Sequence, residues 1–204
     1  MLKTNQKQLL VRAVNLLKPV AGAILILLVL RYTGMLTYVM AATQSAVLMT
    51  GVRDFKPEDP SATPETFDYN FTVRDINGQT RSINDLKGKV IFLNLWATWC
   101  GPCRAEMPGI EKLYADIPKE QIAFVMLSID RPGLEGKVKD YITKEEFTFP
   151  VYTLGGPLPE LLEVPSIPAT FIIDKKGNVV SKHVGTTNFN TGRFRKYLQD
   201  LAAQ

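Results

Sequence analysis

From Phe67 onward, hydrophobic residues occur in short runs that are separated by polar turns. Val90–Leu95 is a continuous run of strand-forming residues, which predicts a buried central strand. Ile122–Ile129 has the same character and predicts a second buried strand. Between these runs, apolar residues recur at helical spacing over Met107–Tyr114, which predicts an amphipathic helix with a kink at Pro108.

The runs before and after this core complete the predicted fold. Strands over Phe71–Val73 and Thr80–Ile83 flank Asn77-Gly78, the strongest short signal for a β-hairpin turn. The remaining expected elements are a helix over Leu134–Phe147, a strand over Val151–Thr153, a short helix over Leu158–Leu162, an antiparallel pair over Thr170–Ile173 and Val179–Val184, and a closing helix over Phe194–Leu201. This order predicts an α/β fold, a central mixed sheet flanked by helices with an N-terminal β-hairpin.

Charge is distributed unevenly along the 204 residues. Residues 1–50 contain five basic residues and no acidic one, whereas the rest of the chain has 19 basic and 20 acidic residues. The net charge of +4 therefore belongs to the N-terminal part. This location indicates orientation in a membrane and argues against binding of nucleic acid.

An uncharged apolar run, Pro19–Leu30, follows the basic N-terminus. We interpret residues 1–50 as a cytoplasmic tail with an uncleaved transmembrane signal anchor, although a spanning helix needs about 20 apolar residues and would have to extend past Arg31 or Lys18. The alternative is a signal peptide cleaved near Val39–Ala41. Either reading places the rest of the chain outside the cytoplasm.

Two regions follow the expected anchor. Residues 51–66 are rich in proline and polar residues and predict a semi-extended linker. Residues 67–204 form the predicted folded domain.

Candidate chemistry is concentrated where the central strand gives way to a helix, at Cys100-Gly101-Pro102-Cys103. Proline suits the first turn of a helix, because its missing N–H group has no partner there in any case. A thiol at a helix N-terminus has a lowered pKa, so Cys100 is the expected nucleophile and Cys103 the resolving thiol. A zinc site would require four ligands, but the chain has two cysteines and one histidine. A purely structural disulfide would close a very small loop and stabilise little.

The residues from Trp96 to Pro108, together with Phe149-Pro150, Ile167–Asp174 and Gly177, closely resemble the thioredoxin-like superfamily, in particular the membrane-tethered thiol–disulfide oxidoreductases of the TlpA/ResA type. The resemblance covers roughly Phe67 to the C-terminus and implies a thioredoxin fold.

The resemblance also implies roles for individual residues. Pro168 is expected to be a cis-proline opposite the cysteines, with Ile167 offering backbone hydrogen bonds to an extended substrate. Glu106 is expected to lie near the cysteines and to modulate their acidity, although its position on an amphipathic helix also suits a plain surface charge. We further expect Trp99 and the Gly101-Pro102 pair to contact the substrate. We expect Trp96 to pack inside the domain, and an ordinary core position is the alternative for both tryptophans.

Asn94 departs from the thioredoxin pattern, which has a buried aspartate at this place in the strand. An amide cannot take a proton from the second cysteine, so the expected base is Glu106 or water.

The resemblance implies reduction of protein disulfides, with apocytochrome c as a candidate substrate, and we expect this activity on the periplasmic or extracytoplasmic side of a bacterial inner membrane. The resemblance also implies a transmembrane thiol electron donor. We expect a monomer that needs no cofactor beyond its redox-active disulfide. The alternatives are a thioredoxin-fold peroxidase and a membrane-tethered binding module.

The basic N-terminus and apolar run generate a topology prediction. We expect the chain to remain in cell membranes during alkaline carbonate extraction and its domain to be digested by protease added from outside. Release of a fully active soluble product that starts near Ala42 would show cleavage instead.

Overall fold

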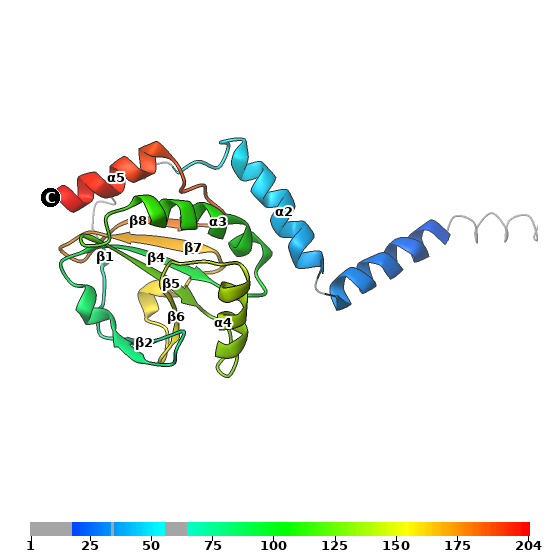
Figure 1. Cartoon of the computed structure of the whole chain (residues 1–204), viewed down its shortest axis with the longest axis horizontal. Coiled ribbons are helices and arrows are strands. Elements are labelled where there is room, and N and C mark those ends of the chain that lie inside the picture. The colour runs from blue at the N-terminus through cyan, green and yellow to red at the C-terminus, as the bar shows by residue number, and fades with distance from the viewer. Residues whose placement is uncertain (1–17, 34, 56–64) are drawn as a thin grey trace, which may run out of the picture. The chain divides into compact units, whose positions relative to one another are not determined.

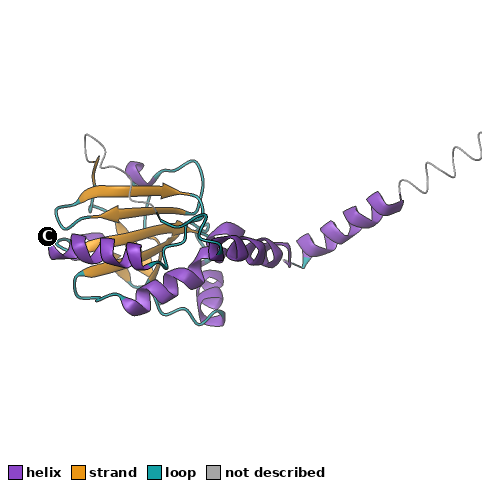
Figure 2. Ribbon diagram, turned by 90° about the horizontal axis from the view of Figure 1, so that it is seen from above, coloured by secondary structure: helices purple, strands orange, loops and turns teal. Residues whose placement is uncertain are grey.

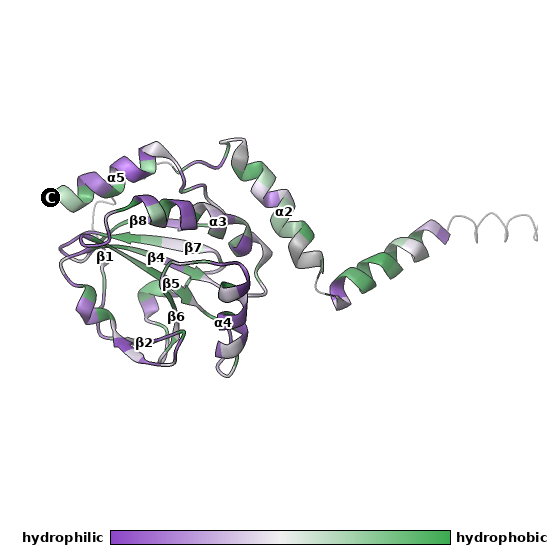
Figure 3. Ribbon diagram, viewed as in Figure 1, coloured by the Kyte–Doolittle hydropathy of each residue, from purple (hydrophilic) through white to green (hydrophobic). Residues whose placement is uncertain are grey.

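The computed structural model of the chain describes residues 18–33, 35–55 and 65–204 (Figure 1). The chain divides into two compact units, Met1–Met40 and Ala41–Gln204. In the first unit, residues 18–32 are helical, and Figure 3 shows this helix as mostly hydrophobic. Among the described residues, no helix combines the length and the hydropathy of a membrane span. Residues 1–17, part of the expected N-terminal tail and anchor, lie outside the described residues.

The second unit is built on a mixed sheet. Within the described residues it has eight strands in the order β1-β8-β7-β4-β5-β6-β2-β3. The strands are β1 (Glu65–Thr66), β2 (Thr72–Asp75), β3 (Thr80–Ser82), β4 (Val90–Trp96), β5 (Ile122–Ser128), β6 (Val151–Leu154), β7 (Ala169–Ile173) and β8 (Asn178–Val184). The central strand β4 runs parallel to β5 and antiparallel to β7, and every residue of β4 is buried.

Among the described helices, α2 (Met35–Met49) comes before the sheet in the chain, and three pack on one face of the sheet: α3 (Gly101–Asp116), α4 (Glu135–Lys144) and α5 (Gly192–Ala203). Figure 2 shows helices gathered along one side of the strands. The connections β4–α3–β5 and β5–α4–β6 each join two neighbouring parallel strands, and the chain moves the same way across the sheet in both. Because such crossovers are right-handed, α3 and α4 lie on the same face of the sheet. The opposite face is covered by residues of the β2–β3 region and by two 3₁₀ turns, Ile83–Leu86 and Glu160–Leu162.

Alternation along β4 decides which side chains face the helices. Val90, Phe92 and Trp96 belong to the hydrophobic cluster under α3 and α5. Ile91, Leu93 and Leu95 belong to the cluster on the other face of the sheet. Because successive strand residues point to opposite faces, Asn94 shares the face on which α3 lies.

The sequence predicted this architecture well. The thioredoxin-like α/β fold is confirmed, as are the β2–β3 hairpin around Gly78 and the β7–β8 pair around Gly177. Both glycines have positive φ values, 80° and 89°, which side chains other than glycine rarely adopt. The helix predicted over 134–147 is shorter than expected, the one over 158–162 is a 3₁₀ turn, and α3 continues through Pro108.

The expected linker over residues 51–66 differs from the structure at both ends. Residues 41–55 belong to the second unit, and Phe55 is only 1% exposed. Glu65–Thr66 forms the edge strand β1. The proline-rich stretch at 56–64 lies outside the described residues. The sequence of this stretch predicted a linker because it is rich in proline and contains few apolar residues. A single phenylalanine within it was not enough to indicate a buried segment.

The burial of Phe55 predicts that this residue contributes to the stability of the domain. Phe55→Ala in the full chain is expected to lower the free energy of unfolding by about 3–5 kcal/mol, because it leaves a cavity among aromatic rings. Chemical denaturation followed by tryptophan fluorescence measures the change. Val52→Ala is the matched control, because Val52 is 77% exposed. Equal effects of the two substitutions would contradict the packing role of Phe55.

Candidate active site

The two cysteines lie where β4 gives way to α3. Cys100 is the N-cap residue of α3, and its Sγ accepts a hydrogen bond from the backbone N–H of Cys103 at 3.2 Å. Pro102 occupies the first turn of the helix, as its sequence position predicted. The cysteines form a disulfide with an S–S distance of 2.08 Å. Cys100 is 5% exposed and Cys103 is fully buried, so the first cysteine is the nearer to solvent.

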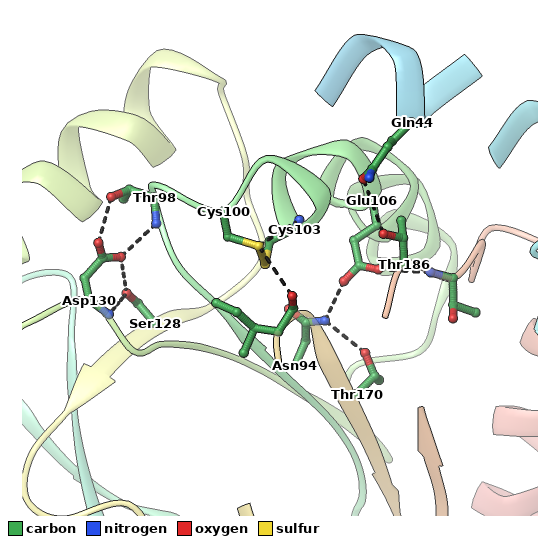
Figure 4. The surroundings of a disulfide bond; sticks show 12 residues. Gln44, Asn94, Thr98, Cys100, Cys103, Glu106, Ser128, Asp130, Thr170 and Thr186 are labelled. Atoms are coloured by element: carbon green, nitrogen blue, oxygen red, sulfur yellow. Dashed lines mark hydrogen bonds between the residues drawn. A yellow bond between two sulfur atoms is a disulfide. The ribbon is translucent and has the colours of Figure 1, made fainter. Parts of the chain in front are cut away.

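A loop before β7 lies against this disulfide. The Sγ atom of Cys100 is 3.8 Å from the carbonyl oxygen of Ile167 (Figure 4). The expected cis peptide bond between Ile167 and Pro168 is confirmed. The carbonyl of Pro168 accepts a hydrogen bond from the backbone N–H of Gly185 at 2.8 Å, which ties the loop to the end of β8. The backbone of this loop is therefore in direct contact with the sulfur of Cys100.

An open groove of about 580 Å³ adjoins the same loop. Its lining includes Trp99, Ile129, Leu158, Glu163, Val164 and Ile167. Trp99 is 60% exposed, in agreement with its expected role at the surface, whereas Trp96 is fully buried. Gly101 is buried and Pro102 half-buried in the first turn of α3, and neither is a lining residue of this groove.

Glu106 lies one helical turn after Cys103 and is also buried, with 2% of its surface exposed. The Asn94 Nδ2 group donates to its Oε1 at 2.8 Å, and the backbone N–H of Thr187 donates to its Oε2 at 3.2 Å. The same Asn94 Nδ2 group donates to the hydroxyl of Thr170 at 2.9 Å (Figure 4). These bonds connect β4, α3, β7 and the loop after β8. The interpretation of Glu106 as a surface charge is therefore wrong.

The environment of Glu106 changes its acidity. Burial raises the pKa of this carboxyl group from 4.5 to about 8, although the hydrogen bonds from Asn94 and Thr187 favour the charged form and oppose the shift. At neutral pH the group is therefore mostly protonated. A neutral carboxylic acid can donate a proton, and after ionisation it can accept one.

Asp130 organises the turn before the cysteines. Its carboxylate accepts hydrogen bonds from the backbone N–H and the hydroxyl of Thr98, at 2.8 and 2.7 Å, and from the hydroxyl of Ser128 at 2.7 Å. Figure 4 shows this cluster beside the disulfide. It fixes the turn that carries Trp99 and Cys100.

The sequence reasoning did not single out Asp130 as a site residue. The available signal was its place just after β5, since the carboxyl ends of parallel strands meet at one edge of a sheet and commonly carry functional residues.

No group of three or more histidine, cysteine, aspartate or glutamate side chains in the described part of the chain is arranged to hold a metal ion. His183 lies on β8, where its Nε2 atom is 2.8 Å from the hydroxyl of Ser181 and its ring packs edge-on against Phe55. Its position is therefore well explained by packing.

The raised pKa of Glu106 generates a prediction about stability. Between pH 4.5 and 8 the folded protein keeps a proton that the unfolded chain releases, so the contribution of Glu106 to stability falls as pH rises through this window and levels off above it. Glu106→Gln in the oxidised protein should remove this fall, which is on the order of a few kcal/mol. Urea denaturation at a series of pH values measures it.

Glu160→Gln is the matched control for this measurement, because Glu160 is exposed. Parallel pH profiles for wild type and Glu106→Gln would show that Glu106 titrates normally in the folded protein.

The sequence matches a model of the AhpC/TSA family over residues 68–182. The thiol–disulfide oxidoreductase ResA of Bacillus cereus is 38% identical over 117 residues, which cover 57% of this chain and 66% of that protein. The thioredoxin-like protein YneN of Bacillus subtilis is 34% identical over 117 residues, which cover 57% of this chain and 69% of that protein. The chain thus spans just under two thirds of the length of the ResA relative that it matches.

Two solved structures are similar in fold. StoA from Bacillus subtilis matches with a TM-score of 0.52 and 25% identity, covering 69% of this chain and 98% of that one. A thioredoxin-family thiol:disulfide interchange protein from Chlorobium tepidum matches with a TM-score of 0.53 and 28% identity, covering 71% and 98%. Because the family model covers more than half of its length, this chain belongs to the AhpC/TSA family, with a thioredoxin-like fold.

Proposed function

We propose that this chain is a thiol–disulfide oxidoreductase that reduces disulfides of other proteins. One observation carries the proposal: the Cys100–Cys103 disulfide lies at the start of a helix and contacts Ile167, which together with Trp99 lines an open groove. The likeness to ResA and to thiol:disulfide interchange proteins supports the same activity.

The proposed reaction has two exchange steps. The Cys100 thiolate attacks one sulfur of the substrate disulfide, forms a mixed disulfide and releases the other substrate sulfur as a thiolate. The Cys103 thiolate then attacks Sγ of Cys100, which frees the second substrate thiol and leaves the Cys100–Cys103 disulfide. Two electrons pass from the dithiol to the substrate, so an external thiol donor must reduce the enzyme again.

The start of α3 supports the proposed roles of the two cysteines. Cys100 precedes the helix and faces its unpaired N–H groups, one of which already contacts its Sγ. This environment favours the thiolate, and Cys100 is also the more accessible sulfur. Cys103 is fully buried and reacts after the mixed disulfide has formed.

Glu106 is the proposed proton partner of Cys103. Both side chains are buried and lie one turn apart on α3. Repulsion between a carboxylate and a thiolate requires ionised Glu106, but its pKa of about 8 keeps it mostly protonated at neutral pH. Removal of the proton from the Cys103 thiol needs the same ionised form, which is the minor form at neutral pH, and the neutral acid that results can return the proton later. Asn94 cannot fill this role, because an amide does not titrate.

The groove supports an extended polypeptide as the substrate. Trp99, Leu158 and Val164 offer apolar surface. In this proposal the backbone of Ile167 pairs with the substrate as an added strand. Gly101 and Pro102 lie between the two cysteines in the first helical turn, close to where the mixed disulfide forms. Oxidised apocytochrome c is a candidate substrate on the strength of the resemblance.

The cellular setting forms part of the same proposal. The basic N-terminus and apolar run support a single-pass anchor in a bacterial inner membrane with the domain on the periplasmic or extracytoplasmic side. A transmembrane thiol donor would then supply electrons to a monomeric enzyme that uses no cofactor besides its disulfide.

Trapping of mixed disulfides tests the two roles. Cys103→Ser removes the second step and leaves the first, so it should accumulate covalent complexes with partner proteins through Cys100. Non-reducing gels show these as bands that reductant removes, and mass spectrometry identifies the partners. Cys100→Ser should accumulate few, because the remaining thiol is buried. Equal trapping by both variants would contradict the assignment of nucleophile and resolver.

Turnover separates the proposed reductase from its alternatives. The reduced wild type should reduce a protein disulfide such as that of insulin and should leave hydroperoxide largely unreacted. Faster reaction with hydroperoxide would favour a peroxidase, and no reaction with either would favour a binding module.

A further inference from the structure

The segment from residue 41 to residue 55, here named the covering segment, packs on the catalytic domain. Near its start, the hydroxyl of Ser45 donates to the carbonyl of Ala105 on α3 at 3.1 Å. The hydroxyl of Thr186 donates to the Gln44 side chain at 3.4 Å (Figure 4). Ala105 directly precedes the buried Glu106, so this contact lies next to the active site.

The far end of the covering segment is fixed to the loop after β8. The backbone N–H of Phe55 donates to the carbonyl of Asn188, and that of Asn188 donates to the carbonyl of Arg53, at 3.2 and 2.8 Å. The side chain of Asn188 also donates to Asp54 at 2.7 Å. The ring of Phe55 lies 4.4 Å from that of Phe194 on α5, measured between centroids. The segment is thus held at both of its ends.

A cavity of about 450 Å³ lies between the covering segment, α3 and the loop over residues 187–190. Its lining includes Ser45, Leu48, Glu106, Gly109, Lys112 and Thr187. Leu48 is 8% exposed, so its side chain is buried at the lining of this cavity. The covering segment therefore forms the outer wall of a space whose inner wall includes the buried carboxyl group.

The charges around this carboxyl group are few. Besides Glu106 itself, the charged side chain on the lining is that of Lys112, which is exposed. The other elements that pack around the group present neutral side chains: Asn94 from β4, Thr170 from β7 and residues 187–190. Access of water to the cavity therefore changes the burial that raises the pKa of Glu106, while the hydrogen bonds from Asn94 and Thr187 oppose that rise.

We propose that Ser45 and Leu48 are positioning residues of the active site, which act through Glu106 by limiting the access of solvent to this cavity. The chemical role of Glu106 rests on the proposed function. The effect of Ser45 and Leu48 on solvent access to Glu106 does not depend on that role. A segment that begins inside the predicted tail and anchor region, residues 1–50, would then be part of the oxidoreductase site.

The test follows the protonation of Glu106 in the oxidised full-length chain, because the disulfide removes the thiols from the titration. Infrared difference spectra between wild type and Glu106→Gln identify the carboxylic acid band of Glu106, and its loss with rising pH gives the titration midpoint. Leu48→Ala opens the outer wall, so the midpoint should fall by about one pH unit as burial is relieved. Ser45→Ala should shift it in the same direction.

Two controls address folding and cavity size. Val47→Ala shortens an apolar side chain next to Leu48 on α2 that is 46% exposed. It should leave the titration midpoint of Glu106 unchanged. Gly109→Ala narrows the cavity from the α3 side, where an added Cβ would lie 3.7 Å from the Asn190 Cβ, an ordinary contact, so the midpoint should not fall. Thermal unfolding of every variant confirms that it is folded.

The outcomes separate this inference from the proposed function. An unchanged midpoint in folded Leu48→Ala and Ser45→Ala, or an equal fall in Val47→Ala, would overturn the inference even if the wild type reduces protein disulfides. A fall confined to the wall variants would support it even if the wild type proved inactive with disulfides. In an active enzyme, the pH profile of exchange between the reduced protein and a small disulfide should shift in the same direction.

Discussion

The burial of one carboxyl group, that of Glu106, is the constraint on which the active site depends. Burying an acid is costly unless it is neutral or hydrogen-bonded, and here both conditions hold. Its two oxygens accept bonds from Asn94 on β4 and from the backbone of Thr187, and Asn94 is in turn bonded to Thr170 on β7. The helix that carries the cysteines is thereby joined to the two central strands by polar contacts, in addition to its apolar packing.

The chemistry of the site follows from this arrangement. Asn94 lies on the face of β4 that α3 covers, and as an amide it holds Glu106 without adding a second titratable group. Glu106 is then the buried acid next to the cysteine pair, with a pKa of about 8. The proposed proton exchange with Cys103 follows from that value, since the group can hold or release a proton close to neutral pH. The Oδ1 atom of Asn94 is buried without a hydrogen-bond partner.

The sequence was most informative where a short-range pattern determines the structure. The run Val90–Leu95 predicted the central strand, and Gly101-Pro102 predicted the start of a helix at the cysteines. The resemblance supplied the cis bond at Pro168, which composition alone would not predict. The burial of Glu106 and the bonds of Asp130 to Thr98 depend on residues far apart in the chain. Neither the helical periodicity around Glu106 nor the position of Asp130 after β5 specifies these partners.

The largest difference from expectation concerns residues 41–55, and it has a chemical consequence. The prolines and polar residues that follow Asp54 predicted a linker outside the domain, yet Phe55 inserts into its aromatic core and Leu48 is buried against α3. A domain boundary placed at Phe67 from the hydrophobic pattern would exclude both residues. A chain cut there would leave the cavity beside Glu106 without its outer wall and would admit water to the carboxyl group. Under our proposal, such a domain would keep the cysteine pair and its helix but would titrate Glu106 differently from the intact chain.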